Sequence, residues 1–334
     1  MDYTRLGNTG LQVSELCFGC MSFGSSAWRP WVLEPADADP FYKRAIEAGI
    51  NFFDTANMYS NGASEEVTGE LLSKYGNRDE LVIATKVHFP TGQGPNMGGL
   101  SRKHIEQACE ASLRRLGIDA IDLYQIHRLD PHTAPEEMLA ALDSLVQKGK
   151  VRYLGASSMY AWEFAKLLSL SERNGWARMV AMQDHYNLLA REEEREMHPL
   201  CDYEGVGVIP WSPLARGHLA GTRKAVGDKS NETTRGRTDG LDTFLYTAES
   251  DRLIIEAVSA VAERHGRPMA QVALAWVSTK PTVTAPIIGV TKLPQLEDAI
   301  ASLEIELSRD DIAEMEAPYV PRRATELGRP SLRA

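Results

Sequence analysis

Four side chains that could deliver a proton to a carbonyl oxygen follow three short apolar segments of the chain. Asp54 ends one segment and Tyr59 lies five residues later, Lys86 ends the next segment, and His127 ends the third. A phenol has a pKa of about 10 and is a poor acid at neutral pH. A neighbouring ammonium lowers that pKa, and a carboxylate can hold the ammonium in place. This set indicates a tyrosine acting as general acid, with an imidazole that donates to the developing negative charge.

Each of these residues also has an ordinary structural interpretation when it is considered alone. A lysine at a strand end is common, a buried histidine is often held by structural hydrogen bonds, and an aspartate can cap a turn. Four such residues on successive strand ends make the catalytic hypothesis the stronger one.

Short β-rich segments alternate with helical patterns from about residue 16 onward. Several of these segments are continuous apolar runs, as expected for parallel strands covered on both sides. Thr133 and Glu136 have the spacing of a capping box, which predicts a helix start there. The predicted strands are 16–19, 50–54, 81–86, 121–127, 151–156, 180–183, 207–211 and 284–289.

Eight strands with intervening helices predict an α/β fold of the (β/α)8 TIM-barrel type, with the whole chain, 1–334, as a single domain. A doubly wound sheet would require a G-x-G-x-x-G after an early strand. The nearest match, at 92–97, lacks the third glycine and follows the third strand. Segments 4–6 and 11–13 predict an N-terminal β-hairpin, and the polar segment 221–240 predicts a long loop after strand seven.

The chain resembles the aldo-keto reductase family over nearly its whole length. The segment 49–56 reads Gly-Ile-Asn-Phe-Phe-Asp-Thr-Ala, and Tyr59 and the Ala-Thr-Lys that ends at Lys86 follow it. Members of that family are barrels that reduce aldehydes and ketones with NADPH. The resemblance implies that Asp54, Tyr59, Lys86 and His127 are the catalytic tetrad. It also implies that hydride passes from nicotinamide C4 to the carbonyl carbon while Tyr59 supplies the proton.

The same resemblance implies where NADPH, or NADP⁺ after the reaction, is held. Ser157 and Gln183 match the family's carboxamide contacts, and Ser158 replaces the usual asparagine. Trp211 stands where an aromatic ring stacks on the nicotinamide, and Lys292 lies where the 2′-phosphate is bound. The full set of implied cofactor contacts is Gly19, Ser157, Ser158, Gln183, Trp211, Ser212, Pro213, Leu214, Arg216, Gly217, Gly289, Thr291, Lys292, Gln295 and Asp298.

Substrate and lid contacts are expected in the loops at the same end of the barrel. The segment 185–197 resembles a microbial branch that includes aryl-alcohol dehydrogenase-like reductases, so aromatic or aliphatic aldehydes are the implied substrates. The segment 221–240 contains Arg223, Arg235 and Arg237 and is predicted to fold over the dinucleotide. The predicted substrate contacts are Met21, Trp28, Phe89 and Arg128.

Composition argues against several classes of partner. A formal net charge of −10 disfavours binding to nucleic acid or to an anionic membrane surface. The N-terminal residues lack the pattern of a signal peptide, which predicts a cytoplasmic protein whose partner is a small-molecule carbonyl compound. Cys17 and Cys20 form a C-x-x-C without a second pair or a nearby histidine, so no metal site is expected and a structural role is favoured.

Two other functions stay open at this point. A cofactor-binding, redox-sensing regulatory subunit would keep the same site but show little turnover. A different TIM-barrel chemistry, such as that of an isomerase or hydrolase, would not bind NADPH. Turnover of an aldehyde with NADPH distinguishes a reductase from a regulatory subunit. Binding of NADPH distinguishes a reductase from an isomerase or hydrolase.

Overall fold

Parallel strands form one sheet whose two edge strands meet, so that the sheet closes into a barrel. A computed structural model describes residues 1–222, 233–240 and 245–322. The strand order is β10-β3-β4-β5-β6-β7-β8-β9, and a parallel bridge between Val208 and Val283 joins the two ends. The predicted (β/α)8 barrel is confirmed. Its strands are β3 (Cys17–Gly19), β4 (Phe52–Asp54), β5 (Val82–Val87), β6 (Ile121–Ile126), β7 (Val151–Ser157), β8 (Met179–Gln183), β9 (Gly207–Val208) and β10 (Ile287–Ile288).

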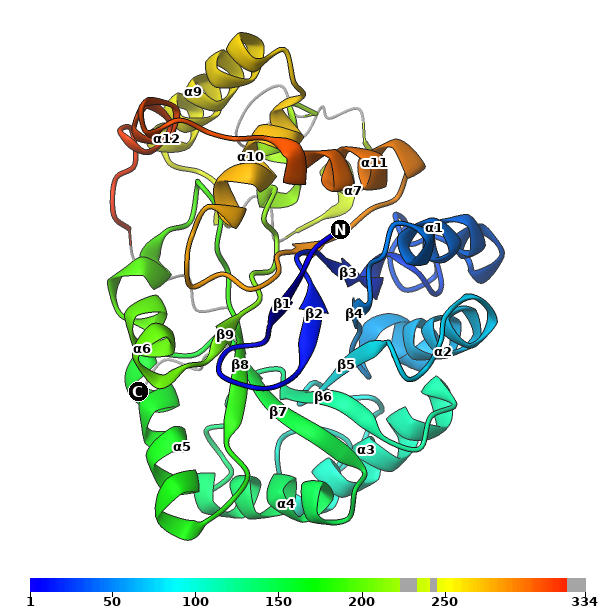
Figure 1. Ribbon diagram of the computed structural model, residues 1–334. Helices are drawn as coiled ribbons and strands as arrows, with labels where there is room; N and C mark the ends of the chain where they lie inside the picture. The colour runs from blue at the N-terminus through cyan, green and yellow to red at the C-terminus, as the bar shows by residue number, and fades with distance from the viewer. Residues whose placement is uncertain (223–232, 241–244, 323–334) are drawn as a thin grey trace.

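Helices surround the strands as an outer layer (Figure 1). They are α1 (Pro35–Glu47), α2 (Ala63–Tyr75), α3 (Arg102–Leu116), α4 (Pro135–Gln147), α5 (Ala161–Asn174), α6 (Met197–Glu204), α7 (Thr234–Thr238), α9 (Glu249–His265), α10 (Met269–Ser278), α11 (Leu293–Ala301) and α12 (Arg309–Glu316). Short 3-10 helices are η1 (Cys20–Ser22), η2 (Tyr59–Gly62), η3 (Glu192–Arg195), η4 (Ala215–Ala220) and η5 (Ser302–Glu304). Within the described ranges, none of the helices combines the length and apolarity of a membrane span.

The last two strands are shorter than the sequence predicts. Segments 207–211 and 284–289 contain Pro210 and Pro286, which have no N–H to give to a neighbouring strand. The backbone nevertheless stays paired, because Thr284 N donates to Val208 O at 2.7 Å and Ile287 N donates to Pro210 O at 2.9 Å. The barrel therefore closes through irregular backbone at this point.

The start predicted for α4 was also wrong in detail. The residue before the helix is Ala134, and Pro135 takes the first helical position, where its missing N–H has no cost. Thr133 donates its hydroxyl to Asp130 at 2.7 Å and does not cap the helix.

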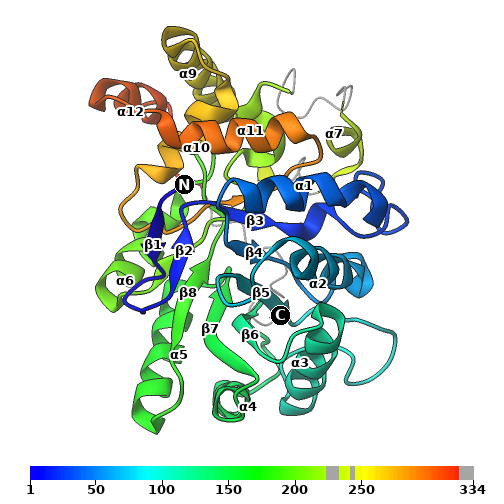
Figure 2. The same ribbon diagram turned by 45° about the vertical axis from the view of Figure 1, so that its right-hand side comes forward.

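The predicted N-terminal hairpin is present and closes one end of the barrel. Strands β1 (Tyr3–Arg5) and β2 (Gln12–Ser14) pair antiparallel, and they cross the end of the barrel that faces the viewer in Figure 1 and turn to its side in Figure 2. Leu6 and Val13 are fully buried among the residues that fill the barrel interior. Asn8 N donates to Gly205 O at 2.8 Å, which ties the hairpin turn to the end of α6. Substrate access is therefore left to the opposite end.

Side chains alternate between the barrel interior and the layer beneath the helices, as the strand period of two requires. Phe52 belongs to the interior cluster, and Phe53 belongs to the cluster between strands and helices. Cys17 belongs to the interior cluster and Cys20 to the cluster between strands and helices, and both thiols are free and buried. Burial raises the pKa of Cys20 to about 12, so its thiol is unreactive at neutral pH. The same alternation places Asp54 in the interior.

Candidate active site

Asp54, Lys86 and Tyr59 form a connected group at the C-terminal ends of neighbouring strands β4 and β5. The ammonium of Lys86 lies 2.5 Å from Asp54 Oδ2, 2.8 Å from Thr55 O and 3.4 Å from the Tyr59 hydroxyl. Lys86 has no exposed surface. All three protons of its ammonium therefore have an oxygen to approach, which is what a buried charge requires. The structure brings these three predicted residues together.

Two glutamines complete the surroundings of the Asp54 carboxylate. Gln125 and Gln183 each donate an amide N–H to Asp54 Oδ1, at 3.0 and 2.9 Å. Gln125 was not among the predicted residues. It could have been found from the alternation in β6, where it stands between Leu123 and His127 on the inward face. A polar residue at that position in an otherwise apolar strand is a signal for a buried contact.

Burial and charge act in opposite directions on the Tyr59 phenol. Burial raises the pKa of Tyr59 above its ordinary value, and Lys86 opposes that rise. The expected net lowering of this pKa by Lys86 is therefore not what the structure gives, because removal from water has the larger effect. For Lys86 itself, burial lowers the pKa, but Asp54 and Tyr59 outweigh it and leave the pKa raised. The group thus holds an ammonium beside a protonated phenol.

His127 lies against the same phenol. The two rings are 5.7 Å apart and almost perpendicular, at 84°. Burial, together with the positive charges of Lys86 and Arg128, holds the pKa of His127 well below its ordinary range. The imidazole is therefore neutral at pH 7 and has one N–H to donate. A carbonyl oxygen placed between Tyr59 and His127 would meet two neutral donors.

The residues implied to hold the nicotinamide meet beside this group. Ser157 on β7 is the register partner of Gln183 on β8, and Ser158 N donates to Gln183 O at 3.0 Å. The indole N–H of Trp211 donates to Ser158 Oγ at 3.0 Å. The Gln183 amide donates to Asp54 and to Gln125, at 2.9 and 3.2 Å, so its oxygen is the atom that could accept from a carboxamide, while the two serine hydroxyls can donate. The donor set fits the nicotinamide end of the cofactor.

His185, which was given no role from the sequence, packs behind Trp211. The rings are 4.2 Å apart and 14° from parallel. The polar run Gln183 to Asn187 directly after a strand was a signal that this segment makes specific contacts.

Strained backbone is concentrated in the loops at this end of the barrel. Most of the non-glycine residues with positive φ among the described ones come directly after a predicted site residue or are one themselves. Such conformations cost about 1–3 kcal/mol each and persist where the surroundings enforce them. Those next to the site are Ser60, Asn61, Ser158, Ser212, Ala215 and Arg216. The turn after β9 also contains Pro213, Leu214 and Gly217 of the predicted set.

The predicted phosphate end lies at the start of α11. Lys292 is the residue before this helix and is exposed, and no contact of its ammonium is found among the described residues. Gln295 Oε1 instead accepts from Thr291 N at 2.8 Å and Lys292 N at 3.1 Å. Asp298 accepts from Gln271 at 2.9 Å. Gln295 and Asp298 are thus engaged within the protein, and their contacts with adenine stay predictions.

Close packing of strands explains one of the two predicted glycines. A Cβ at Gly19 would lie 2.8 Å from Ile287 and 3.0 Å from Ile288 O, because β3 and β10 approach closely there. A Cβ at Gly289 would lie 3.9 Å from the guanidinium of Arg235, which is an ordinary van der Waals distance. Backbone packing therefore requires glycine at position 19, whereas packing does not explain Gly289.

The described part of the long loop crosses this end of the barrel. Asp239 has no exposed side-chain surface and lies between Arg216, at 3.2 Å, and Arg235, at 3.3 Å. Arg235 also stacks over the Trp31 ring at 4.4 Å. These contacts connect the loops that follow β9 and β3. Arg223, predicted in the same segment, lies outside the described residues.

Aromatic rings flank Tyr59 and His127. Trp28 is 6.1 Å from the Tyr59 ring, and Phe89 is 4.8 Å from His127 on its other side. Arg128 lies 5.9 Å from the Phe89 ring and donates to Ser157 Oγ at 3.3 Å. Met21 lies half-buried in η1. Trp28, Phe89 and Arg128 are thus brought to the proposed reaction point.

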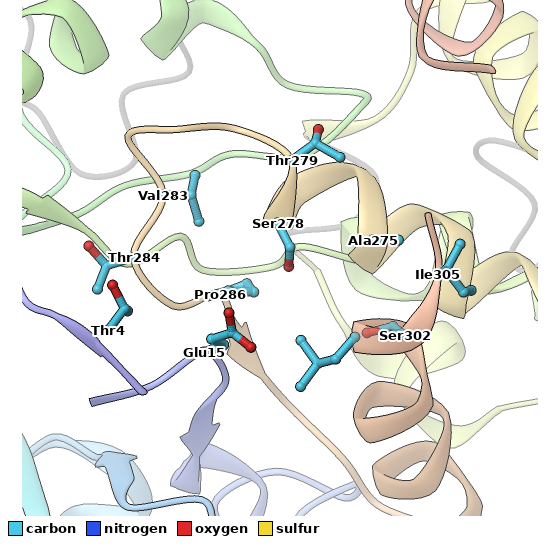
Figure 3. A pocket seen from close by; sticks show the side chains of 11 residues that line it. Thr4, Glu15, Ala275, Ser278, Thr279, Val283, Thr284, Pro286, Ser302 and Ile305 are labelled. Carbon is cyan, nitrogen blue, oxygen red and sulfur yellow. The ribbon is translucent and has the colours of Figure 1, made fainter. Parts of the chain in front are cut away.

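A cavity of about 290 Å³ lies elsewhere, beside the hairpin and the end of α10. Figure 3 shows Glu15 and Ser278 extending toward each other across it. None of the predicted site residues lines this cavity. Because barrel enzymes place their catalysis at the C-terminal ends of the strands, we assign the active site to the Asp54 end.

Comparison with known proteins gives the family. The model of the Aldo/keto reductase family matches residues 15–319, and the chain therefore belongs to that family. Versiconal hemiacetal acetate reductase of Aspergillus parasiticus is 44% identical over 96% of this chain and 98% of its own length. A Schizosaccharomyces pombe protein provisionally named aryl-alcohol dehydrogenase is 43% identical over 96% of each chain. An aldo-keto reductase of Alternaria alternata is 43% identical over 95% of this chain and 91% of its own.

Membership of this family defines the class of protein. The protein is an oxidoreductase of a family that generally uses NAD(P)H and acts on small-molecule substrates.

Proposed function

We propose that this protein reduces aldehydes or ketones to alcohols with NADPH, and that Tyr59 donates the proton. The observation that carries the proposal is the position of the buried Lys86 ammonium between Asp54, at 2.5 Å, and the Tyr59 hydroxyl, at 3.4 Å. An ammonium beside a phenol stabilises the phenolate that forms as the proton leaves. Bound NADPH would supply the hydride.

The residues of the chain then have separate roles. Tyr59 gives its proton to the carbonyl oxygen, and His127 donates a second hydrogen bond to the same oxygen. Lys86 stabilises the phenolate, and Asp54 holds Lys86 in position. Ser157, Ser158 and Gln183 would hold the carboxamide, Trp211 would stack on the nicotinamide, and Lys292 would bind the 2′-phosphate.

Aromatic aldehydes are the substrates that the surroundings favour. Trp28 and Phe89 present ring surfaces on either side of Tyr59 and His127. Such surfaces favour a flat aromatic ring, since ring pairs contribute about 0.5–1.5 kcal/mol beyond the area they bury. The name of the Schizosaccharomyces pombe relative refers to aryl alcohols, which is consistent with this choice.

Turnover of benzaldehyde with NADPH, followed by loss of NADPH absorbance, tests the proposal. Tyr59→Phe should lower kcat by about a hundredfold to ten-thousandfold, because the phenol that gives the proton is removed. Its NADPH affinity should match that of the wild type. Tyr203→Phe is a matched control, because Tyr203 is 86% exposed on α6. A folded Tyr59→Phe variant that keeps more than about a tenth of the wild-type kcat would overturn the assignment. Cofactor binding without turnover in the wild type would favour a regulatory subunit.

A further inference from the structure

Arg29 is a half-buried cation near the proposed site whose guanidinium lies against two aromatic rings. Its guanidinium carbon lies 4.6 Å from the centre of the Trp28 ring and 5.9 Å from that of Trp31. No hydrogen bond or ion pair of its side chain is found among the described residues. Contact with an aromatic face compensates a buried cation only in part, because it contributes about 0.5–2 kcal/mol.

The other arginines of this region are engaged. Arg216 and Arg235 both lie beside Asp239, at 3.2 and 3.3 Å. Arg128 donates to His127 O at 2.5 Å and to Ser157 Oγ at 3.3 Å. Arg29 differs from them because its five N–H donors are not satisfied by any described residue. Burial lowers the pKa of Arg29 despite the opposing charge of Asp239, a carboxylate that is shared with Arg216 and Arg235.

A row of aromatic rings leads from Arg29 to the proposed reaction point. Trp28 is 6.1 Å from Tyr59, Tyr59 is 5.7 Å from His127, and His127 is 4.8 Å from Phe89. A flat substrate whose carbonyl reaches Tyr59 and His127 would extend along these rings. Arg29 stands at the Trp28 end of the row.

We infer that Arg29 is a specificity-determining residue that binds an anionic substituent, such as a carboxylate, on the ring of an aromatic aldehyde substrate. This inference rests on the proposed function, since it places the carbonyl at Tyr59. A guanidinium presents two parallel N–H groups that match the two oxygens of a carboxylate, and such charge-assisted pairs are strong where water is partly excluded. The substrate class is thereby narrowed from aromatic aldehydes to acidic aromatic aldehydes.

The pair 4-carboxybenzaldehyde and 4-formylbenzamide tests this, because the two probes have nearly the same shape and differ in charge. For the wild type, kcat/KM should favour the carboxylate by about ten- to a hundredfold. Arg29→Met should bring the ratio of the two kcat/KM values close to one, mainly through the KM of the carboxylate. Arg29→Lys keeps the charge without the bidentate geometry and should give an intermediate ratio. Arg309→Met removes a positive charge from the first turn of the outer helix α12 and should keep the wild-type ratio.

Three results would overturn the inference. Equal wild-type turnover of the two aldehydes removes the role of Arg29 and leaves the proposed function standing. A fluorescence titration in which Arg29→Met weakens NADPH binding while the substrate ratio stays at its wild-type value would assign Arg29 to the cofactor phosphates. Absence of turnover with either aldehyde would overturn the proposed function and this inference with it. Circular dichroism of each variant shows that the fold is kept.

Discussion

The imidazole of His185 lies flat against the indole of Trp211, with ring centres 4.2 Å apart and planes 14° from parallel. The imidazole is fixed in turn, because its Nε2 is 2.7 Å from the Tyr246 hydroxyl. Burial and the nearby Arg216 lower the pKa of His185 to about 3, so the ring stays neutral across the physiological range. His185 therefore acts on Trp211 through packing and position, without a charge.

Loss of this stack should weaken cofactor binding. His185→Ala should raise the Kd for NADPH roughly two- to tenfold, since an aromatic pair contributes about 0.5–1.5 kcal/mol beyond burial. His185→Phe keeps a ring against Trp211 but loses the hydrogen bond to Tyr246, so its Kd should lie closer to the wild type. Quenching of tryptophan fluorescence by NADPH measures both. Identical Kd values for His185→Ala and the wild type would show that the stack does not position Trp211 for the cofactor.

In the pH profile of kcat for reduction, the loss of activity at alkaline pH, the alkaline limb, should report the ionisation of Tyr59. The acid form of the phenol is the active one, so activity is present below the pKa of Tyr59 and is lost as pH rises through it. Burial raises that pKa above its ordinary value of about 10. Because the pKa of His127 is held well below its ordinary range, His127 should not titrate between about pH 6 and 8. We therefore expect kcat to be flat in that range.

Lys86→Met should lower kcat at least as strongly as Tyr59→Phe and should move this limb to still higher pH. The reason is that Lys86 opposes the effect of burial on the phenol. Removing one member of a buried ion pair also costs about 3–5 kcal/mol of stability. The double variant Lys86→Met with Asp54→Asn removes the unpaired carboxylate and should recover part of the lost Tm without recovering activity. An alkaline limb at the wild-type pH in the single variant would show that Lys86 does not tune Tyr59.

The barrel, and the clustering of the four proposed catalytic side chains, could be predicted from the sequence because both depend on local patterns. Apolar runs specify buried parallel strands, and the residue that ends each run is placed at the catalytic end of a barrel. The positions of Asp54, Lys86 and His127 could be predicted without knowledge of loop geometry. The strands predicted to contain Pro210 and Pro286 were predicted too long, because an apolar pattern does not take account of residues that lack an N–H.

Contacts that depend on how distant loops fold could not be predicted. Asp239 meets Arg216 because the segment after β9 returns across the barrel, and no periodicity encodes that path, whereas its contact with Arg235, four residues earlier, is local. Arg29 reaches the site for a similar reason, since its loop after β3 has no regular pattern. The net pKa of Tyr59 also required the burial of its ring, which the sequence does not give.

Asp239 should hold the segment that contains α7 over the bound cofactor. It is buried between two arginines, one from each side of the crossing. Asp239→Asn removes the charge that pairs with both and should speed NADP⁺ release several-fold in a stopped-flow experiment. Asp119→Asn, an exposed change before β6, is the matched control. Limited proteolysis within 233–240, the described part of this segment that contains α7, should also be slowed by NADP⁺ in the wild type. Equal cleavage with and without NADP⁺ would reject a lid at this position.

Cofactor choice should depend on Lys292. NADPH differs from NADH by a 2′-phosphate with nearly two negative charges, so preference requires a cation at that point. Lys292 is exposed at the start of α11, where the positive end of the helix dipole also favours an anion. A lysine offers a point charge without a bidentate fork, so NADPH should be preferred by about ten- to a thousandfold in kcat/KM. Lys292→Ala should remove most of this preference by weakening NADPH alone, and Lys292→Glu should reverse it, whereas Lys103→Ala on the surface of α3 should leave it intact. Equal use of NADH and NADPH by the wild type, or a preference that survives Lys292→Ala, would show that another residue selects the cofactor.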